Sequence, residues 1–295
     1  MKTLITCLLV LLLTACSAAP PAQEPVAPPE DEQPPLGTVE DVAEAYVRYQ
    51  VETDVWGDTC ITEDGIHLVS YTAEIPVLKA FREDGTEIVS ADHPEEEQAV
   101  ATVEAFNRRF ESWYAEEEFL KLARTAEEDL AWVEEEGLHW YGGYELELSC
   151  DIYQTDHLVS VSGVYCSYTG GAHPNTYLLG WTFDLERGVF FGAETLAGQE
   201  PFQTAVSEEI IRQAEVKAME YDAAPEEFFW PEYETIIGDW PSYAISFDAS
   251  GMSVAFSPYE LAAYAAGPQT FELSYEFLKP YLDEHGLEVL GLDEE

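Results

Sequence analysis

The residues able to do acid–base or nucleophilic chemistry are present, but their spacing forms no catalytic motif. The six histidines, at positions 67, 93, 139, 157, 173 and 285, include no pair with the helical spacing of a zinc protease. No serine has the flanking glycines of a hydrolase nucleophile turn, and no two cysteines have CxxC spacing. A glycosidase pair of carboxylates cannot be singled out among 59 acidic residues. We therefore assign no catalytic residue and expect no metal and no cofactor.

The one covalent modification that the sequence predicts is at Cys16. This cysteine closes a short apolar run, and the preceding Leu13-Thr14-Ala15 has the form of a bacterial lipobox. The run over residues 4–13 is about half of the roughly 20 apolar residues that a spanning helix needs. We therefore predict a lipoprotein signal peptide over residues 1–15 and lipid attachment at Cys16. The membrane then holds the protein through this N-terminal lipid, on the outer face of the bacterial cytoplasmic membrane.

The composition indicates a folded and strongly acidic protein. Hydrophobic residues make up 46% of the chain and aromatic residues 13%, which is enough for a sizeable core, while the formal net charge is −47. Such a surface repels nucleic acid, which we exclude as a partner, and attracts cations and basic proteins. The proline-rich residues 16–37 are typical of an extended tether.

Apolar residues recur at helical spacing in three regions. A short helix is predicted within residues 38–53, and residues 92–136 must contain two or more helices. A third amphipathic helix is predicted over residues 202–221.

Alternating apolar and polar residues predict strands in the remaining parts. A strand over residues 66–80 is followed by a turn at 83–85, and an antiparallel meander of four strands is predicted over residues 144–191. Further strands at 243–247, 252–256 and 270–274 precede a last helix at 275–284. The predicted fold class is α+β, with antiparallel sheets packed against helices, and two consecutive sub-domains forming one compact ectodomain.

Three cysteines, Cys60, Cys150 and Cys166, follow the predicted lipid site. Outside the cell a disulfide is permitted, and Cys150 and Cys166 lie on predicted neighbouring strands, where facing positions could bring their sulfurs together. A set of unpaired, buried thiols is the alternative.

The segment 168–177 carries the first group of candidate ligand-binding residues. Two glycines permit positive φ there and place His173 in a turn before a proline, with Tyr168 and Tyr177 on either side, where they could pack against it. His173 either contacts a ligand or fixes its own turn through hydrogen bonds.

The segment 256–267 carries the second group, namely Pro258, Tyr259 and Tyr264. Tyrosines offer rigid contact area with a polar tip, which suits a protein-binding loop. The alternative is that Tyr259 and Tyr264 anchor this irregular segment onto the sheet.

Together, the two segments are similar to the extracellular region shared by the lysozyme-sensing anti-sigma factor RsiV and the peptidoglycan deacetylase PdaC. The resemblance covers residues 60–282 and includes Phe183-Asp184-Leu185 and the closing strand near residue 273. It implies an α+β fold made of consecutive domains of unknown function. We place these domains at residues 38–175 and 176–285, followed by an acidic tail over 286–295.

The resemblance also implies a function. In the sensor branch of this family the region binds lysozyme, a cationic protein, and an acidic surface is compatible with such a partner. We therefore expect an extracytoplasmic module that binds a protein or cell-wall ligand, with cationic lysozyme-like proteins as the most specific candidate class of partner. Two alternatives stay open: a peptidoglycan-acting hydrolase or esterase that uses His173 and nearby acids, and an acidic envelope scaffold.

Overall fold

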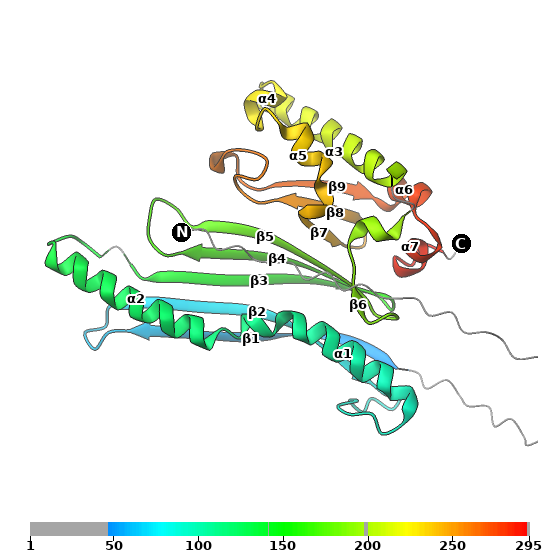
Figure 1. Ribbon diagram of the computed structural model, residues 1–295, viewed down its shortest axis with the longest axis horizontal. Helices are drawn as coiled ribbons and strands as arrows, with labels where there is room; N and C mark the ends of the chain where they lie inside the picture. The colour runs from blue at the N-terminus through cyan, green and yellow to red at the C-terminus, as the bar shows by residue number, and fades with distance from the viewer. Residues whose placement is uncertain (1–46, 141, 198–199, 294–295) are drawn as a thin grey trace, which may run out of the picture. The chain divides into compact units, whose positions relative to one another are not determined.

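The computed structural model of this protein describes residues 47–293, apart from residues 141 and 198–199 (Figure 1). The predicted signal peptide, Cys16, the tether at 16–37 and the first part of the predicted helix at 38–53 lie outside the described residues. The described chain forms a six-stranded and a three-stranded sheet, each packed against helices. The predicted α+β class is confirmed. None of the helices described is long and apolar enough to cross a bilayer.

The six-stranded sheet has its strands in sequence order. They are β1 (Arg48–Ile61), β2 (His67–Phe81), β3 (Tyr144–Gln154), β4 (Leu158–Tyr168), β5 (Asn175–Asp184) and β6 (Val189–Phe190). The meander predicted over residues 144–191 is confirmed as β3 to β6. Strands β2 and β3 are parallel, and all other neighbours in this sheet are antiparallel. A parallel pair needs a long crossover connection, which the helical region between these strands supplies.

Strand β1 corrects the helix predicted at 38–53. Residues 48–61 form a strand that pairs with β2 along its whole length, from Arg48 opposite Phe81 to Ile61 opposite His67. Valine, threonine and isoleucine are frequent in this segment, and pairing with a buried neighbour overrides the helical spacing. The turn predicted after β2 is confirmed, but the returning chain makes only one bridge, between Phe81 and Glu87.

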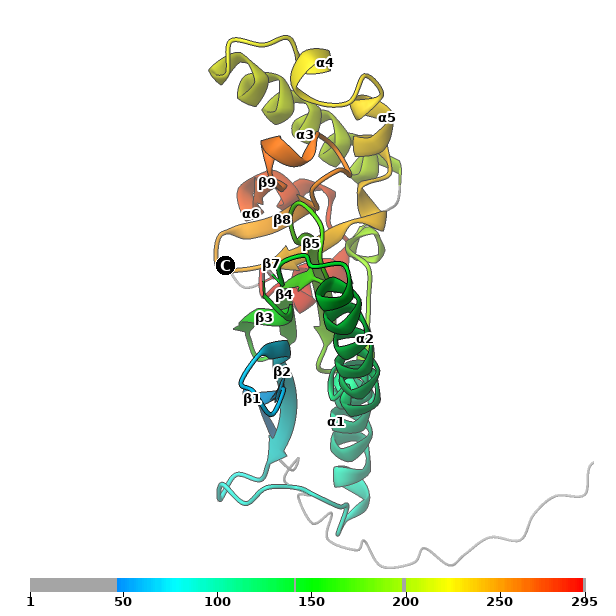
Figure 2. The ribbon, with the colours of Figure 1, turned by 90° about the vertical axis from the view of Figure 1, so that its left-hand side faces the viewer.

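Helices α1 (Glu97–Phe110) and α2 (Glu116–Glu135) cover one face of the six-stranded sheet (Figure 2). They confirm the prediction of two or more helices over residues 92–136. Phe106 and Phe110 are fully buried in the core between α1 and the sheet. Pairing of β2 with β3 ends at Ala73. Beyond that point, the side-chain amide of Asn107 makes the hydrogen bonds with the β2 backbone that a neighbouring strand would otherwise make. It accepts from Leu78 N at 2.8 Å and donates to Leu78 O at 3.1 Å.

The three-stranded sheet consists of β7 (Ala244–Phe247), β8 (Gly251–Phe256) and β9 (Gln269–Ser274), all antiparallel. Helix α3 (Glu200–Glu220) shares the core on one face of this sheet. The predicted strands and the helix predicted at 202–221 are therefore confirmed. Two short helices, α4 (Pro225–Phe228) and α5 (Tyr233–Gly238), connect α3 to the sheet.

The C-terminal part differs from the prediction in two respects. The last helix predicted at 275–284 ends early, as α6 (Tyr275–Leu278) followed by one turn of 3-10 helix. The predicted acidic tail at 286–295 begins inside a further helix, α7 (Glu284–Val289). Val289 and Leu290 are buried in the core of the smaller sheet, because their apolar side chains are more stable there than in water.

The two sheets meet where β7 contacts β5 and β4. Phe247 N donates to Ser160 Oγ at 2.7 Å, and Leu178 N donates to Ser257 Oγ at 3.0 Å. These bonds satisfy backbone groups at strand edges that have no neighbouring strand. The predicted domain division between residues 175 and 176 falls at the first residues of β5, which pairs with β4 in the larger sheet.

Cys60, Cys150 and Cys166 are free thiols. Of the two alternatives for Cys150 and Cys166, the facing positions that a disulfide needs are not found, because the register places Cys150 opposite Gly163 and Cys166 opposite Glu147. The two side chains consequently lie on opposite faces of the sheet, since successive residues of a strand alternate between faces.

Candidate binding site

The two sequence segments meet in space at an aromatic cluster formed by His173, Tyr259 and Tyr264. His173 lies in the turn between β4 and β5, and both tyrosines lie between β8 and β9. The rings of His173 and Tyr264 are stacked, with centroids 3.7 Å apart and planes inclined by 17°. Tyr259 completes the cluster at 5.6 Å from Tyr264 and 6.2 Å from His173.

Hydrogen bonds fix the orientation of the rings. His173 Nδ1 lies 3.0 Å from Pro174 O, and its Nε2 lies 3.3 Å from the Tyr259 hydroxyl. A neutral imidazole with its proton on Nδ1 satisfies both contacts, by donating to the carbonyl and accepting from the hydroxyl. Tyr264 also donates to Pro174 O, at 3.2 Å. His173 therefore does fix its turn, and it joins that turn to the second segment.

Tyr259 has an unusual backbone conformation. Its φ is +75°, in a region that residues other than glycine, asparagine and aspartate rarely adopt. Tyr259 N donates to Ala262 O at 3.1 Å, and Trp230 Nε1 donates to Tyr259 O at 3.0 Å, which holds the conformation in place. The result is a tyrosine that is 54% exposed. Strained backbone that presents an exposed aromatic ring is typical of functional sites.

A pocket of about 240 Å³ adjoins the cluster. It is lined by Asn175, Thr176, Tyr177, Pro258, Tyr259 and Tyr264. The structure thus brings five of the six candidate ligand-binding residues to one place. Tyr177 contributes to the pocket wall, and its ring stacks on that of Tyr165 with centroids 6.2 Å apart. The rings that pack beside His173 are those of Tyr259 and Tyr264, and not that of Tyr177.

Tyr168, the sixth candidate, lies elsewhere. Its hydroxyl donates to Gly171 O at 3.2 Å, and its ring lines a different pocket, of about 310 Å³, together with Trp132 and Trp140. Tyr168 is thus a neighbour of the turn and not of the aromatic cluster.

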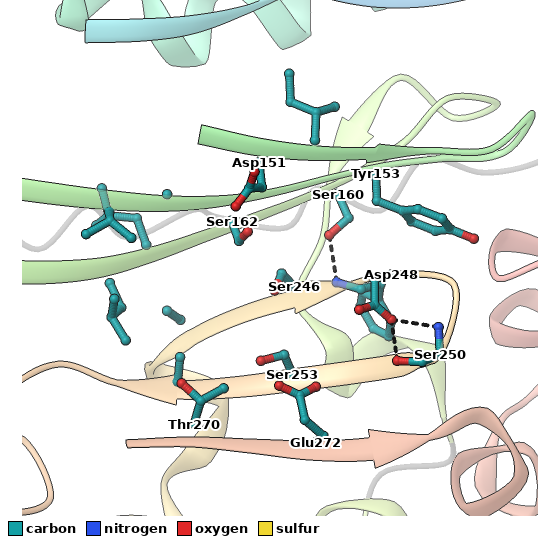
Figure 3. A pocket seen from close by; sticks show the side chains of 18 of the residues that line it. Asp151, Tyr153, Ser160, Ser162, Ser246, Asp248, Ser250, Ser253, Thr270 and Glu272 are labelled. Atoms are coloured by element: carbon teal, nitrogen blue, oxygen red, sulfur yellow. Dashed lines mark hydrogen bonds between the residues drawn. The ribbon is translucent and has the colours of Figure 1, made fainter. Parts of the chain in front are cut away.

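Sequence reasoning missed a groove of about 640 Å³ between the two sheets (Figure 3). Its polar residues are single serines and acids at alternate strand positions, such as Ser162, Ser253 and Glu272. No motif could have identified them, since only the tertiary structure brings the strands together. Over the described residues, no three histidine, cysteine or acidic side chains gather in a way that would hold a metal ion.

Two of the comparisons with known proteins name the same family of unknown function. Residues 196–276 match the family model described as a protein of unknown function (DUF3298). Among solved structures, the chain is similar to a member of the DUF3298 family from Bacteroides fragilis, with 12% sequence identity and a TM-score of 0.58, over 85% of this chain and 99% of that chain. A DUF3298 family protein from Pseudomonas aeruginosa matches with 15% identity and a TM-score of 0.43, over 81% of this chain and 96% of that chain. No curated protein matches the chain. The protein therefore carries a DUF3298 domain match from just before α3 through β9, on a fold shared with the Bacteroides fragilis protein.

Proposed function

We propose that this protein is a lipid-anchored, extracytoplasmic module that binds a protein or cell-wall ligand, with cationic lysozyme-like proteins as the partner class. The observation that carries the proposal is the cluster of His173, Tyr259 and Tyr264, in which segments far apart in the chain hold an exposed tyrosine in one orientation. Such an arrangement is preorganised for contact with a partner.

Preorganisation matters because ordering side chains on binding consumes part of the interaction energy. Tyr259 and Tyr264 are each fixed by a hydrogen bond to the other segment before any partner arrives. Tyrosines in this state supply apolar area and a polar tip with little loss of entropy, and they often dominate binding energy at interfaces.

The same contacts argue against a hydrolase or esterase that uses His173. A general base must have a nitrogen available to the nucleophile it activates. Both ring nitrogens of His173 already face hydrogen-bonding groups, namely Pro174 O and the Tyr259 hydroxyl. The geometry therefore supports binding better than hydrolysis.

Charge and the N-terminal motif supply the rest of the proposal. A net charge of −47 draws cationic proteins toward the surface and raises their rate of association. Lipid attachment at Cys16 would keep the module at the outer face of the membrane, where secreted lysozymes act.

Calorimetry with the purified chain and lysozyme, at low and then at physiological salt, tests the binding proposal. We expect an affinity that falls as salt rises. Tyr259→Gly removes the ring while retaining a residue suited to positive φ, and it should weaken binding by about tenfold or more. Tyr221→Ala, which removes another tyrosine that is 64% exposed, should leave binding unchanged. Absence of binding at low salt would rule out the lysozyme class.

The anchor is tested separately in cells. The natural chain should incorporate radiolabelled fatty acid and partition with detergent, and Cys16→Ser should do neither. An unlabelled natural chain would contradict the anchor without affecting the binding test.

A further inference from the structure

The helix-free faces of the two sheets face each other across the polar groove (Figure 3). On the larger sheet, Leu148 and Val161 point into the helical core, so the alternate positions form the opposite face. On the smaller sheet, Val254 and Phe271 point into the core with α3. Polar side chains line both walls, among them Asp151, Ser162, Ser246, Asp248, Ser253 and Glu272.

The groove stays open because its side chains are small. Sheets that pack face to face normally fill the space of about 10 Å between them with interdigitating side chains. Here the facing positions include Ser162, Ser246, Ser253 and Ala255, which cannot span that distance. The volume of about 640 Å³ lies within the range of ordinary ligand sites. The serine hydroxyls can both donate and accept hydrogen bonds.

The groove is negatively charged on both walls. Asp151 comes from β3 of the larger sheet, while Glu272 comes from β9 and Asp248 from the turn after β7. No lysine, arginine or histidine is among the residues lining the groove in the described chain. A ligand bearing positive charge would thus meet carboxylates from both sides.

Glu272 and Asp248 differ in how well their charges are compensated. Ser250 N and Ser250 Oγ each donate to Asp248 Oδ1 at 2.6 Å, and these bonds hold the Asp248 pKa below its usual value. The Glu272 pKa is raised, chiefly because burial removes water from the carboxylate, with repulsion from Asp248 adding to the effect and a hydrogen bond from Ser253 opposing it. A cation would relieve this repulsion.

We propose that the groove binds an extended basic peptide segment. Its lysine or arginine side chains pair with Asp151, Asp248 and Glu272, and its backbone amides bond to the serine hydroxyls. A neutral glycan would leave the three carboxylates uncompensated, so charge complementarity favours the peptide. The groove shares no lining residue with the pocket beside the aromatic cluster, and the inference is therefore independent of the proposed lysozyme-type partner.

The test titrates the full chain with a short, fluorescently labelled peptide of alternating lysine and serine, followed by anisotropy at physiological salt. The double variant Asp151→Asn with Glu272→Gln should weaken binding by about tenfold. A charge-matched control, Glu127→Gln with Glu128→Gln, removes two exposed carboxylates from α2 and should leave the affinity nearly unchanged. Equal weakening by both double variants would assign binding to the diffuse acidic surface and overturn the proposal.

A steric variant tests the same site without changing charge. Thr270 on β9 lines the groove and is exposed, so Thr270→Trp should narrow the groove and abolish peptide binding while the melting temperature stays unchanged. Undiminished peptide binding by this variant would overturn the proposal. A different outcome is that the natural chain binds a neutral chitin oligosaccharide but not the peptide, and that Thr270→Trp abolishes the oligosaccharide binding. The ligand of the groove would then be a glycan and not a peptide. Tyr259→Gly should leave peptide binding intact, which separates this test from that of the proposed function.

Discussion

Gly180 of β5 and Ile245 of β7 touch backbone to backbone where the two sheets meet. A Cβ at Gly180 would lie 2.1 Å from Ile245 O and 2.4 Å from Ile245 N, which no side chain can tolerate. The contact therefore sets how closely the sheets approach. The hydrogen bond from Leu178 N to Ser257 Oγ, next to Pro258 of the second candidate segment, lies two residues away on β5. The groove and the aromatic cluster thus both depend on this junction.

Gly180→Ala should destabilise the protein by about 2 kcal/mol, because the added methyl group forces two backbones apart. Urea unfolding followed by circular dichroism measures the change. Gly238→Ala is the matched control, since a Cβ there meets nothing within 4 Å. If the two variants unfold at the same urea concentration, the sheet junction is not as tight as described.

Glu96→Gln should lower stability at neutral pH but not at pH near 2. Glu96 is 4% exposed, and its carboxylate accepts hydrogen bonds from Arg82 Nε at 2.6 Å and from Arg82 Nη2 at 3.0 Å. Chiefly through these bonds, its pKa falls from the usual 4.5 to about 2 in the folded state. A lowered folded pKa means that the ionised side chain stabilises the fold above about pH 4.5, and that this contribution disappears as the pH falls to 2.

Urea midpoints at several pH values measure this difference between Glu96→Gln and the natural chain. Glu97→Gln, which changes an exposed neighbour, should behave like the natural chain at every pH. A Glu96→Gln deficit that stayed constant down to pH near 2 would contradict the role of the Arg82 pair.

Tyr259→Ala should be less stable than Tyr259→Gly by about 1 kcal/mol, because alanine strains the backbone at positive φ and glycine does not. Both variants lack the ring, so their difference isolates the backbone conformation from side-chain contacts. Thermal and urea unfolding of the pair provide the measurement. Equal stability would mean that the loop relaxes to negative φ once the ring is absent.

The Cys150 thiol should resist alkylation by iodoacetamide at pH 8 in the native protein. Burial, with repulsion from Glu74 and Asp151, raises its pKa to about 12, so almost no reactive thiolate is present. Peptide mapping by mass spectrometry after brief labelling reports which cysteine reacts, and labelling in urea should release the protection. Air oxidation should also give no bond between Cys150 and Cys166, whose side chains lie on opposite faces of the sheet. Rapid native labelling of Cys150 would contradict its burial.

Several elements could be predicted from the sequence because local pattern and tertiary packing agree in them. Apolar residues at helical spacing identified α1, α2 and α3, and the alternation after residue 143 identified the meander. Strand β1 could not be predicted, because it depends on pairing with β2, a neighbour that local periodicity does not reveal. The resemblance identified His173, Tyr259 and Tyr264 as candidate binding residues, but it did not reveal that their rings are in contact.

By itself, the sequence determined the charge, the fold class, most helices and strands, and the two segments that carry the aromatic residues. These follow from composition and from patterns that extend over a few turns or strand positions. The tertiary structure alone decided the cysteine register, the separation of Tyr168 from the cluster, and the groove between the sheets. Each of these depends on which strand faces which, a relationship between distant residues that the free energy of packing selects and local sequence does not encode.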